Sequence, residues 1–318
     1  MYDFHIVGGG FAGLTLAYKL IQKGAHVLLQ DHFHSGSGTI ASGALLNPLS
    51  GPHLALPTQG GPEYSRIIED YHSWEQKLSK QLLTPHKHLR VLANDRQKRK
   101  LLNNQDKQSF VRVWHNTKEK NIIMPLGAID ILQTYVIDPH SYIRIMKNYL
   151  QQQGSYLQEE WDPKQPVKAN KTILCMGPFD PFAKESLHYV RGETLIISLK
   201  EPLDYILSKG VALIPLNKQH HGKHLYKLGS TYDRYTPLEY KRTTKGREDL
   251  LHQLRQFYTG DVQVVGHQYG VRPVGPDRSS LWGLHPDNDK YYILNGMGSK
   301  GTLNAPYYAD LLITELIS

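Results

Sequence analysis

A glycine-rich turn near the start of the chain constrains its fold more than any other feature. The apolar run Asp3–Val7 predicts a strand and leads directly into Gly8-Gly-Gly10-Phe-Ala-Gly13, which fits the pattern GxGxxG. Apolar residues then recur with helical spacing over Phe11–Lys23, and a second strand is expected over Ala25–Gln30. A strand, glycine turn, helix and strand in this order are typical of a Rossmann-type unit that binds a dinucleotide.

The residues of this turn each have a mechanical role. Gly8 permits the tight turn, Gly10 lets the backbone approach the pyrophosphate, and Gly13 lets the helix pack closely on the strand. The phosphates would meet the free N–H groups at the positive end of the helix dipole. Asp31 follows the second strand and is placed to accept hydrogen bonds from the adenosine ribose. The motif does not by itself separate NAD from FAD.

The composition predicts a folded protein with substantial apolar cores. The chain has 318 residues, of which 40% are hydrophobic and 10% aromatic. No apolar run reaches the ~18 residues that a membrane-spanning helix needs, and the N-terminal residues lack the pattern of a secretory signal. The single cysteine, Cys175, excludes an internal disulfide and a CxxC redox pair. We therefore expect a cytoplasmic protein.

Alternating strand and helix signals occur at both ends of the chain, with antiparallel-looking strands between them. We therefore expect an α/β fold, in which a discontinuous Rossmann-type domain carries an inserted α+β domain built mainly on an antiparallel sheet. The expected division assigns residues 1–75, 131–185 and 265–318 to the dinucleotide domain, and residues 76–130 and 186–264 to the substrate domain. Among the expected elements are a loop over residues 32–61, a strand over 121–125 and a final helix over 305–317.

Seven further motifs follow the glycine turn. They are Ser37–Pro48, Val136–Pro139, Thr172–Gly177, Arg191–Thr194, Leu228–Thr231, Gly270–Pro273 with Asp277 and Gly283, and Asn295–Thr302 followed by Ala305-Pro306. In these motifs and their order, nearly the whole chain resembles the FAD-dependent D-amino-acid oxidase family, which includes glycine and sarcosine oxidases. Within that family, the last two motifs resemble most closely the FAD domain of the bifunctional enzyme that completes methylaminomethyl groups on the wobble uridine of tRNA.

The resemblance implies FAD as the cofactor and passage of a hydride from the substrate α-carbon to flavin N5. It also implies which residues contact the cofactor. They are Gly8, Gly10, Phe11, Ala12, Gly13, Asp31, His32, Ser37, Ser42, Gly43, Gly177, Gly296, Gly298, Ser299, Gly301 and Thr302.

Two cationic residues are the candidate catalytic residues. Arg272 is the expected substrate clamp, because a guanidinium fork holds a carboxylate by two hydrogen bonds. The alternative is a structural arginine that pairs with Asp277. The backbone of Gly296–Thr302 is expected to face the flavin N1–C2=O region, where reduced flavin carries negative charge. Lys300 either adds to that field or is solvated.

Two clusters have less specific interpretations. Tyr226, Tyr232 and Tyr235 either line the substrate pocket or belong to the core. His220, His221 and His224 have no acid or cysteine beside them to complete a metal site. We therefore expect a solvated turn there and no bound metal.

The net charge of +8 is unevenly distributed along the chain. Residues 76–130 carry 12 Lys and Arg against 4 Asp and Glu, and residues 186–264 carry 12 against 8. A basic substrate domain attracts polyanions, as a tRNA-borne carboxymethylaminomethyl uridine would require. An ordinary solvated lysine-rich surface is the alternative, since the sequence carries no RNA-binding signature.

The function favoured by these observations is FAD-dependent oxidation of the C–N bond of a small amine or amino acid. A first alternative applies the same chemistry to the tRNA uridine. An alternative from another class is a flavin-binding or RNA-binding protein without turnover. A nicotinamide enzyme is a further alternative, because the glycine motif suits both dinucleotides.

Overall fold

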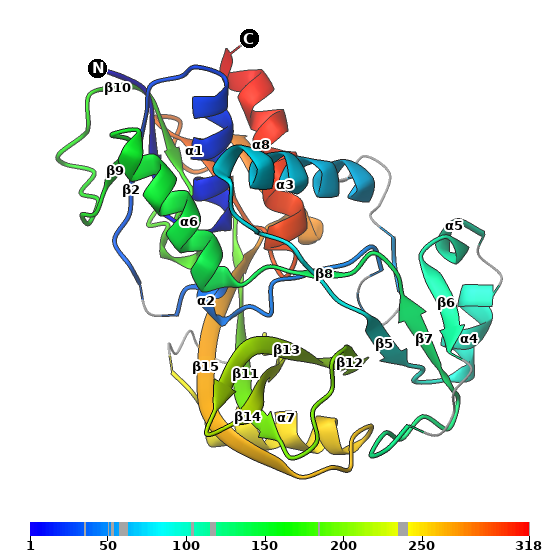
Figure 1. Cartoon of the computed structure of the whole chain (residues 1–318). Helices are drawn as coiled ribbons and strands as arrows, with labels where there is room; N and C mark the ends of the chain where they lie inside the picture. The colour runs from blue at the N-terminus through cyan, green and yellow to red at the C-terminus, as the bar shows by residue number, and fades with distance from the viewer. Residues whose placement is uncertain are drawn as a thin grey trace.

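A computed structural model gives the fold of the chain. The structure describes residues 1–34, 36–49, 51, 54–56, 63–102, 105–114, 119–183, 185–234 and 241–317. Two large sheets dominate it. In Figure 1 the six-stranded sheet and its helices form the upper half, and the eight-stranded sheet forms most of the lower half.

The six-stranded sheet has the order β16-β17-β10-β1-β2-β9. Its strands are β1 (Tyr2–Val7), β2 (Val27–Gln30), β9 (Tyr156–Leu157), β10 (Ala169–Leu174), β16 (Leu281–Leu284) and β17 (Tyr292–Asn295). All of its pairs are parallel except β16–β17. The carboxyl ends of β1, β2 and β10 therefore meet at one edge, where ligands of open α/β sheets bind.

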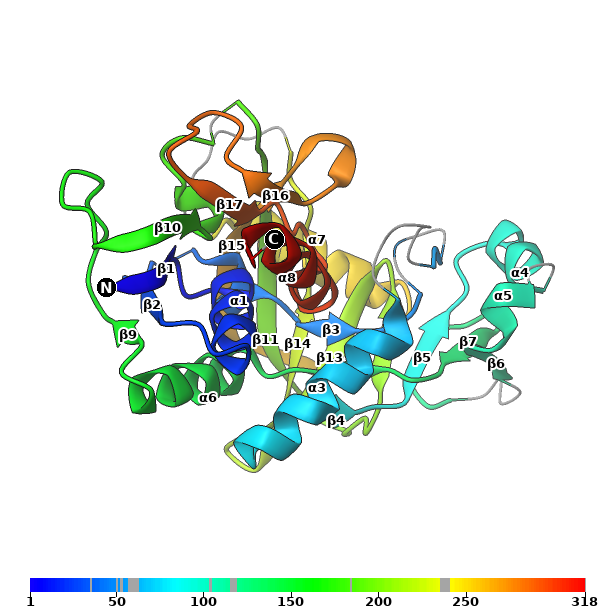
Figure 2. The same ribbon diagram turned by 90° about the horizontal axis from the view of Figure 1, so that it is seen from above.

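Helices cover this sheet and bury its apolar faces. They are α1 (Phe11–Gln22), α3 (Tyr64–Leu78), α6 (Pro139–Gln152) and α8 (Gly301–Ile317). Figure 2 shows α8 lying against α1, and α3 also packs on α8. Lys19 of α1 joins the three helices, because its ammonium pairs with Asp70 of α3 at 2.7 Å and with Asp310 of α8 at 2.8 Å. None of the described helices is long and apolar enough to cross a membrane.

The eight-stranded sheet has the order β15-β11-β14-β13-β12-β5-β7-β6. Its strands are β5 (His88–Val91), β6 (Val111–Trp114), β7 (Ala128–Ile131), β11 (His188–Leu199), β12 (Ile206–Lys209), β13 (Val211–His220), β14 (Lys223–Gly229) and β15 (Val262–Val274). Only the β5–β12 pair is parallel, so the expected antiparallel sheet is present. The helix α7 (Thr244–Arg255) packs on it.

Smaller elements complete the described chain. A three-stranded sheet joins β3 (Leu45–Leu46), β8 (Tyr135–Val136) and β4 (Thr84–Pro85). Short helices are α2 (Gly38–Ala41), α4 (Asp95–Leu102) and α5 (Gln105–Gln108), with 3₁₀ turns η1 (Gly177–Phe179) and η2 (Pro276–Arg278). Three expected domain boundaries fall inside elements: residues 75 and 76 lie in α3, residues 130 and 131 in β7, and residues 264 and 265 in β15.

The expected strand over residues 121–125 is wrong. Ile122 makes only an isolated bridge with Tyr258, and the strand that joins the sheet is β7, several residues later. Pro125 has no N–H to donate to a ladder, and Gly127 has a φ of 83°, so the chain turns before β7 begins. The loop over residues 32–61 is also less uniform than expected, since it contains α2 and β3.

The last helix begins at Gly301, four residues before the expected start. Pro306 lies inside this helix and has no N–H to donate to the carbonyl of Thr302. That carbonyl instead accepts a hydrogen bond of 2.8 Å from the Tyr71 hydroxyl of α3. Tyr71 is fully buried, so the helix keeps its first turn although it contains a proline.

Candidate cofactor and substrate site

A cavity of about 550 Å³ lies where the carboxyl edge of the six-stranded sheet meets the eight-stranded sheet. The glycine turn, the ends of β2 and β10, and the first turn of α8 form one part of its wall. Thr194, Ala212, Ile214 and Lys227 of the antiparallel sheet form another. Segments that are far apart in the sequence therefore share a single elongated site.

The glycine turn forms the end of the cavity beside α1. Gly8 has a φ of 108°, and a Cβ there would lie 2.5 Å from the Cys175 carbonyl. A Cβ on Gly13 would lie only 1.9 Å from the Gly8 carbonyl. Gly8, Gly10, Phe11 and Ala12 line the cavity, whereas Gly13 does not, so Gly13 serves packing. Gly10 has no side chain to cap α1, and the first N–H group of the helix, on Phe11, donates to the Thr39 hydroxyl at 3.3 Å.

Asp31 lies on the wall beside this turn, as its position after β2 predicts. Its carboxylate accepts a hydrogen bond of 2.7 Å from the Gly9 N–H. His32 also lines the cavity. Sequence reasoning missed the neighbouring His34, whose ring stacks on Phe179 with centroids 4.3 Å apart, and both rings belong to the same wall.

The loop that contains α2 passes along the cavity and is held against the antiparallel sheet. Ser37, Ser42 and Gly43 all line the cavity. Ser37 forms a bridge with Val271 of β15, and a Cβ on Gly43 would lie 2.6 Å from the Ile214 side chain. The glycine therefore allows loop and sheet to approach this closely.

Lys227 is a cavity residue that sequence reasoning missed. It lies on β14 and is 5% exposed, and its ammonium donates to the Ser42 carbonyl at 2.8 Å and to the Ile40 carbonyl at 3.3 Å. The pKa of Lys227 is lowered to about 8, mainly by burial. The charge of Asp138 opposes this shift, whereas the charge of Lys218 acts in the same direction as burial. A lysine between Leu225 and Leu228 in an apolar strand was the available signal.

The C-terminal motif supplies another stretch of wall. Gly177, Gly298, Ser299, Gly301 and Thr302 line the cavity. The helix N-terminus of α8 lies within this motif and not after it, which brings the positive end of its dipole to the wall.

Two predicted residues of this motif are not on the wall. Gly296, with a φ of 72°, turns the chain behind the wall, and its N–H donates to the Asn295 side chain at 2.8 Å. Lys300 is also absent from the wall, and burial lowers its pKa. The structure therefore places the Lys300 side chain off the wall, and its contribution to the field at the flavin stays a prediction.

Arg272 reaches the cavity from β15. Its guanidinium donates to the Ser230 hydroxyl and, at 3.4 Å, to the Thr231 carbonyl, and it lies 5.8 Å from the Tyr232 ring centroid. Burial lowers the pKa of Arg272, and Tyr232 opposes that shift. Among the described residues its hydrogen-bond acceptors are Ser230 and Thr231, so the alternative of a pairing with Asp277 is not the arrangement found.

The remaining candidates separate into core and surface. Tyr226 is 1% exposed and bonds to the backbone of Leu203, so it belongs to the core. Tyr232 is half exposed beside Arg272. Tyr235 lies outside the described residues. His220, His221 and His224 are exposed at the β13–β14 turn.

In the part of the chain that the structure describes, no group of three or more His, Cys, Asp or Glu side chains is arranged to hold a metal ion.

The cavity residues fit an FAD molecule. Gly8, Gly9 and Gly10 add no side chains at the α1 end, and the N-terminus of α1, with its positive dipole end and the Thr39 hydroxyl beside it, suits phosphates. Asp31 offers a carboxylate for a ribose. The cavity then extends from the glycine turn to Arg272, so one elongated ligand and a small substrate can share it.

Comparisons with known proteins agree with this geometry. The family model described as FAD dependent oxidoreductase (DAO) matches residues 3–315. Iminodiacetate oxidase from Chelativorans sp. BNC1 is similar, with a TM-score of 0.78 and 17% identity over 99% of this chain and 95% of that one. Glycine oxidase from Bacillus cereus has a TM-score of 0.76 and 15% identity, over 99% and 96%.

An FAD-bound structure is similar as well. Reduced L-α-glycerophosphate oxidase from Mycoplasma pneumoniae has a TM-score of 0.75 and 16% identity, over 100% of this chain and 95% of that one. At these identities the likeness shows the fold alone. The expected α/β fold, with an antiparallel sheet beside a Rossmann-type sheet, is thereby confirmed.

Proposed function

Because the chain belongs to the DAO family of FAD-dependent oxidoreductases, we propose that it oxidises the C–N bond of an amine that carries a carboxylate. FAD is its cofactor, and bound flavin accepts the hydride that the α-carbon of such a substrate loses. The family assignment removes the nicotinamide alternative and the alternative of a binding protein without turnover.

The observation that carries the proposal is the half-buried guanidinium of Arg272 in the cavity wall. Arginine binds a carboxylate by two parallel hydrogen bonds, which fixes both its position and its orientation. Two of the structurally similar proteins have names that specify amino-acid substrates, glycine oxidase and iminodiacetate oxidase. Both substrates are amines with a carboxylate one carbon away.

Two further positive groups beside the cavity favour negative charge on a bound ligand. Lys227 and the N-terminus of α8 both face the cavity, and each favours negative charge on a ligand beside it. Arg272 adds a third positive group. We propose that Lys227 and α8 stabilise the charge that the cofactor gains, whereas Arg272 neutralises the substrate carboxylate.

Anaerobic reduction of the flavin tests this function directly. Purified enzyme is mixed with glycine, sarcosine, L-proline or iminodiacetate, and the flavin absorption is followed. We expect at least one of these amines to bleach the flavin, and the matching carboxylic acid without the amine to leave it oxidised. If every amine leaves it oxidised, the proposal is wrong.

A second candidate substrate is the tRNA-borne carboxymethylaminomethyl uridine, which carries the same amine and carboxylate. The supporting observation is the exposed basic surface of the substrate region. Arg96, Lys98 and Arg99 are exposed on α4, and Lys241, Arg242, Lys245 and Arg247 are exposed at or near the start of α7. Such a surface raises the rate of encounter with a polyanion and makes binding salt-sensitive.

A mass comparison of tRNA nucleosides with and without the enzyme tests this candidate. Loss of the carboxymethyl group from the uridine only in the presence of enzyme would support it. If the nucleosides are unchanged while free amines are still oxidised, the tRNA candidate is wrong and oxidation of small amines remains as the function. A tRNA substrate would be met in the cytoplasm, the compartment that the single buried cysteine predicts.

We also propose the two-domain division, with residues 1–75, 131–185 and 265–318 forming the FAD domain and residues 76–130 and 186–264 the substrate domain. Its support is that strands of the six-stranded sheet come from the first set of segments. Because α3, β7 and β15 are continuous, we place the practical boundaries after Leu78, after Ile131 and before Val262.

A further inference from the structure

We infer that Gly192, Ser230 and Thr231 form a seat that fixes the orientation of the Arg272 guanidinium, and are therefore positioning residues for the substrate. This inference rests on the proposed role of Arg272 as the carboxylate clamp. It concerns a different question, namely what holds the clamp in one orientation.

Gly192 provides the floor of the seat. It pairs with Gly270 in the β11–β15 ladder, two residues before Arg272 on β15. A Cβ on Gly192 would lie 2.3 Å from both terminal nitrogens of Arg272 and 2.5 Å from Cζ. The guanidinium therefore occupies the space that a side chain at residue 192 would fill. No other residue type leaves this space free.

Ser230 and Thr231 provide the acceptors. The Ser230 hydroxyl and the Thr231 carbonyl each accept one N–H of the guanidinium. A guanidinium has five N–H groups, so three are left when these two bonds are made. Three donors in a fixed plane suffice for both oxygens of a carboxylate.

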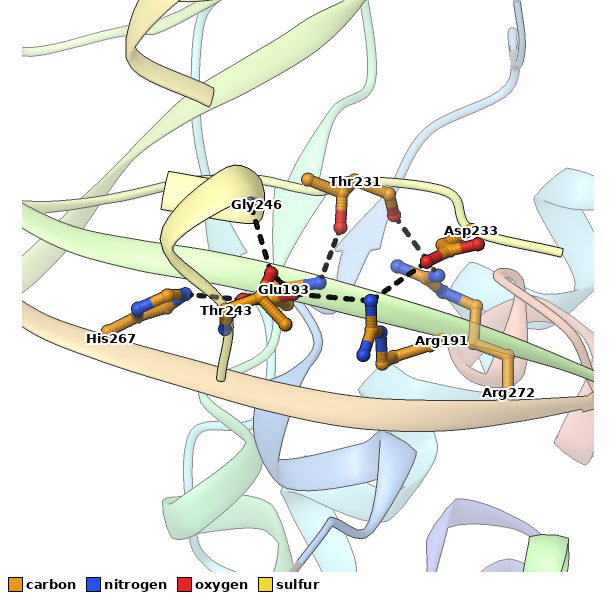
Figure 3. Close-up of polar contacts among 8 residues, drawn as sticks. All are labelled: Arg191, Glu193, Thr231, Asp233, Thr243, Gly246, His267 and Arg272. Atoms are coloured by element: carbon orange, nitrogen blue, oxygen red, sulfur yellow. Dashed lines mark hydrogen bonds and ion pairs between the residues drawn. The ribbon is translucent and has the colours of Figure 1, made fainter. Parts of the chain in front are cut away.

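Thr231 is in turn fixed to β11. Its N–H donates to the Glu193 carbonyl at 3.1 Å, and its hydroxyl accepts the Glu193 N–H at 2.8 Å (Figure 3). Two residues later, Asp233 exchanges two backbone hydrogen bonds of 3.0 Å with Arg191, and their side chains pair at 2.8 Å. The acceptors therefore cannot follow the guanidinium if it moves.

The Glu193 side chain fixes the strand from its other face. Glu193 is 1% exposed, and its carboxylate accepts the Thr243 N–H at 2.8 Å and the Thr243 hydroxyl at 2.7 Å. It also lies 2.7 Å from the His267 ring nitrogen of β15. Figure 3 shows this carboxylate between the start of α7 and the strand that carries Arg272. The seat is thus tied to both neighbouring elements.

The inference explains why the chain carries Arg-Gly-Glu-Thr at residues 191–194. Gly192 leaves room for the guanidinium, while Arg191 and Glu193, on the opposite face, hold the segment that supplies its acceptors. Thr194 then returns to the cavity wall. Side chains therefore alternate along β11, with the residues beside Arg272 and the cavity on one face and the residues that hold the acceptor segment on the other.

Gly192→Ala tests the floor, because the new methyl group must move the end of a flexible side chain and does not meet backbone. We expect the variant to keep its FAD and its melting temperature, while KM for the best amine of the panel and the inhibition constant of acetate rise about tenfold or more. Gly266→Ala, on the neighbouring strand β15, is the matched control and should leave both constants unchanged.

Thr231→Val and Thr231→Ser test the acceptors. Valine removes the hydroxyl that accepts the Glu193 N–H, and we expect the same rise in KM and in the acetate constant. Serine keeps that hydroxyl and should stay within about threefold of wild type. Normal constants in both Gly192→Ala and Thr231→Val, with Arg272→Ala impaired, would overturn the seat while the clamp stands. Normal turnover of Arg272→Ala would overturn the clamp and the seat together, as would a panel in which no amine is oxidised.

Discussion

The Asp31 carboxylate lies directly against Gly9, whose N–H donates to it over 2.7 Å. A Cβ on Gly9 would fall 2.6 Å from this carboxylate, so a side chain at Gly9 would displace Asp31 from its place. The contact holds Asp31 on the cavity wall at the end of β2. The backbone of the glycine turn therefore fixes the position of the Asp31 carboxylate.

The first prediction concerns this acid. Asp31→Ala removes a charged acceptor for the ribose, and we expect FAD affinity to fall about 10-fold to 100-fold, or about 1.5–3 kcal/mol. Titration of the apoprotein with FAD, followed by flavin fluorescence, measures it. Asp31→Asn keeps one acceptor and should lose less. Asp289→Asn, at an exposed position, is the control, and equal affinities in all variants would contradict the assignment.

The second prediction separates a packing glycine from a ligand glycine. In Gly13→Ala the methyl group would lie 1.9 Å from the Gly8 carbonyl, so we expect a loss of about 1–3 kcal/mol or more in the free energy of unfolding. In Gly10→Ala the nearest atom is the Thr39 hydroxyl at 3.1 Å, and the methyl group faces the cavity. That variant should fold normally and bind FAD weakly.

Thermal unfolding without added FAD, together with FAD titration, measures both effects. The prediction fails if Gly10→Ala is the less stable protein, or if Gly13→Ala keeps wild-type stability.

The third prediction concerns Arg272. Arg272→Ala should keep its flavin and lose about 10²-fold to 10³-fold in kcat/KM, since two charge-assisted hydrogen bonds to the substrate are removed. Arg272→Lys keeps the charge but not the planar fork, and should recover only part of the loss. Stopped-flow flavin reduction with the best amine of the panel is the measurement. Wild-type reduction by Arg272→Ala would show that the substrate is held elsewhere.

The fourth prediction concerns Lys227. Burial lowers the pKa of its ammonium from 10.5 to about 8. Between these values the unfolded chain holds a proton that the folded protein does not, so stability rises as pH increases through this window. The shift of the Lys227 pKa changes the free energy of unfolding by about 3 kcal/mol across this window. This stabilisation is fully present above pH 10.5 and is lost as pH falls to 8. Lys227→Met should therefore lack this part of the pH dependence.

Denaturant unfolding of wild type and Lys227→Met at several pH values between 8 and 10 gives the difference. Lys200→Met is the control, because Lys200 is exposed and its ammonium is not buried in the folded protein. A wild-type slope in Lys227→Met would mean that other groups cause the dependence.

Local sequence patterns predicted the parts of the molecule that short-range geometry decides. The glycine turn could be predicted because the strand, the glycines, the helix and the second strand follow one another directly in the sequence. The same is true of Asp31, which simply follows β2. The reason that residues 121–125 form no strand is also local. Apolar residues at this site favour a strand, but Pro125 has no N–H to donate to a ladder.

Tertiary contacts decide the rest. Nothing near Lys227 in the sequence shows that its ammonium meets the carbonyls of Ile40 and Ser42. The acceptors of Arg272 come from a segment about forty residues earlier, and the motif around Arg272 gives no sign of them. Lys300 is a similar case, because its place in the C-terminal motif does not show that its side chain lies off the cavity wall, just before α8.

The packing of α8 on α1 has a consequence for how the protein is made. α1 is buried along most of its length, and α8, which shares its core, consists of the last residues of the described chain. A ribosome that has released only the N-terminal β-α-β unit has produced a dinucleotide site with one side open. Completion of the FAD site therefore waits until α8 has been synthesised, and until then α1 lacks the helix that covers this part of its surface.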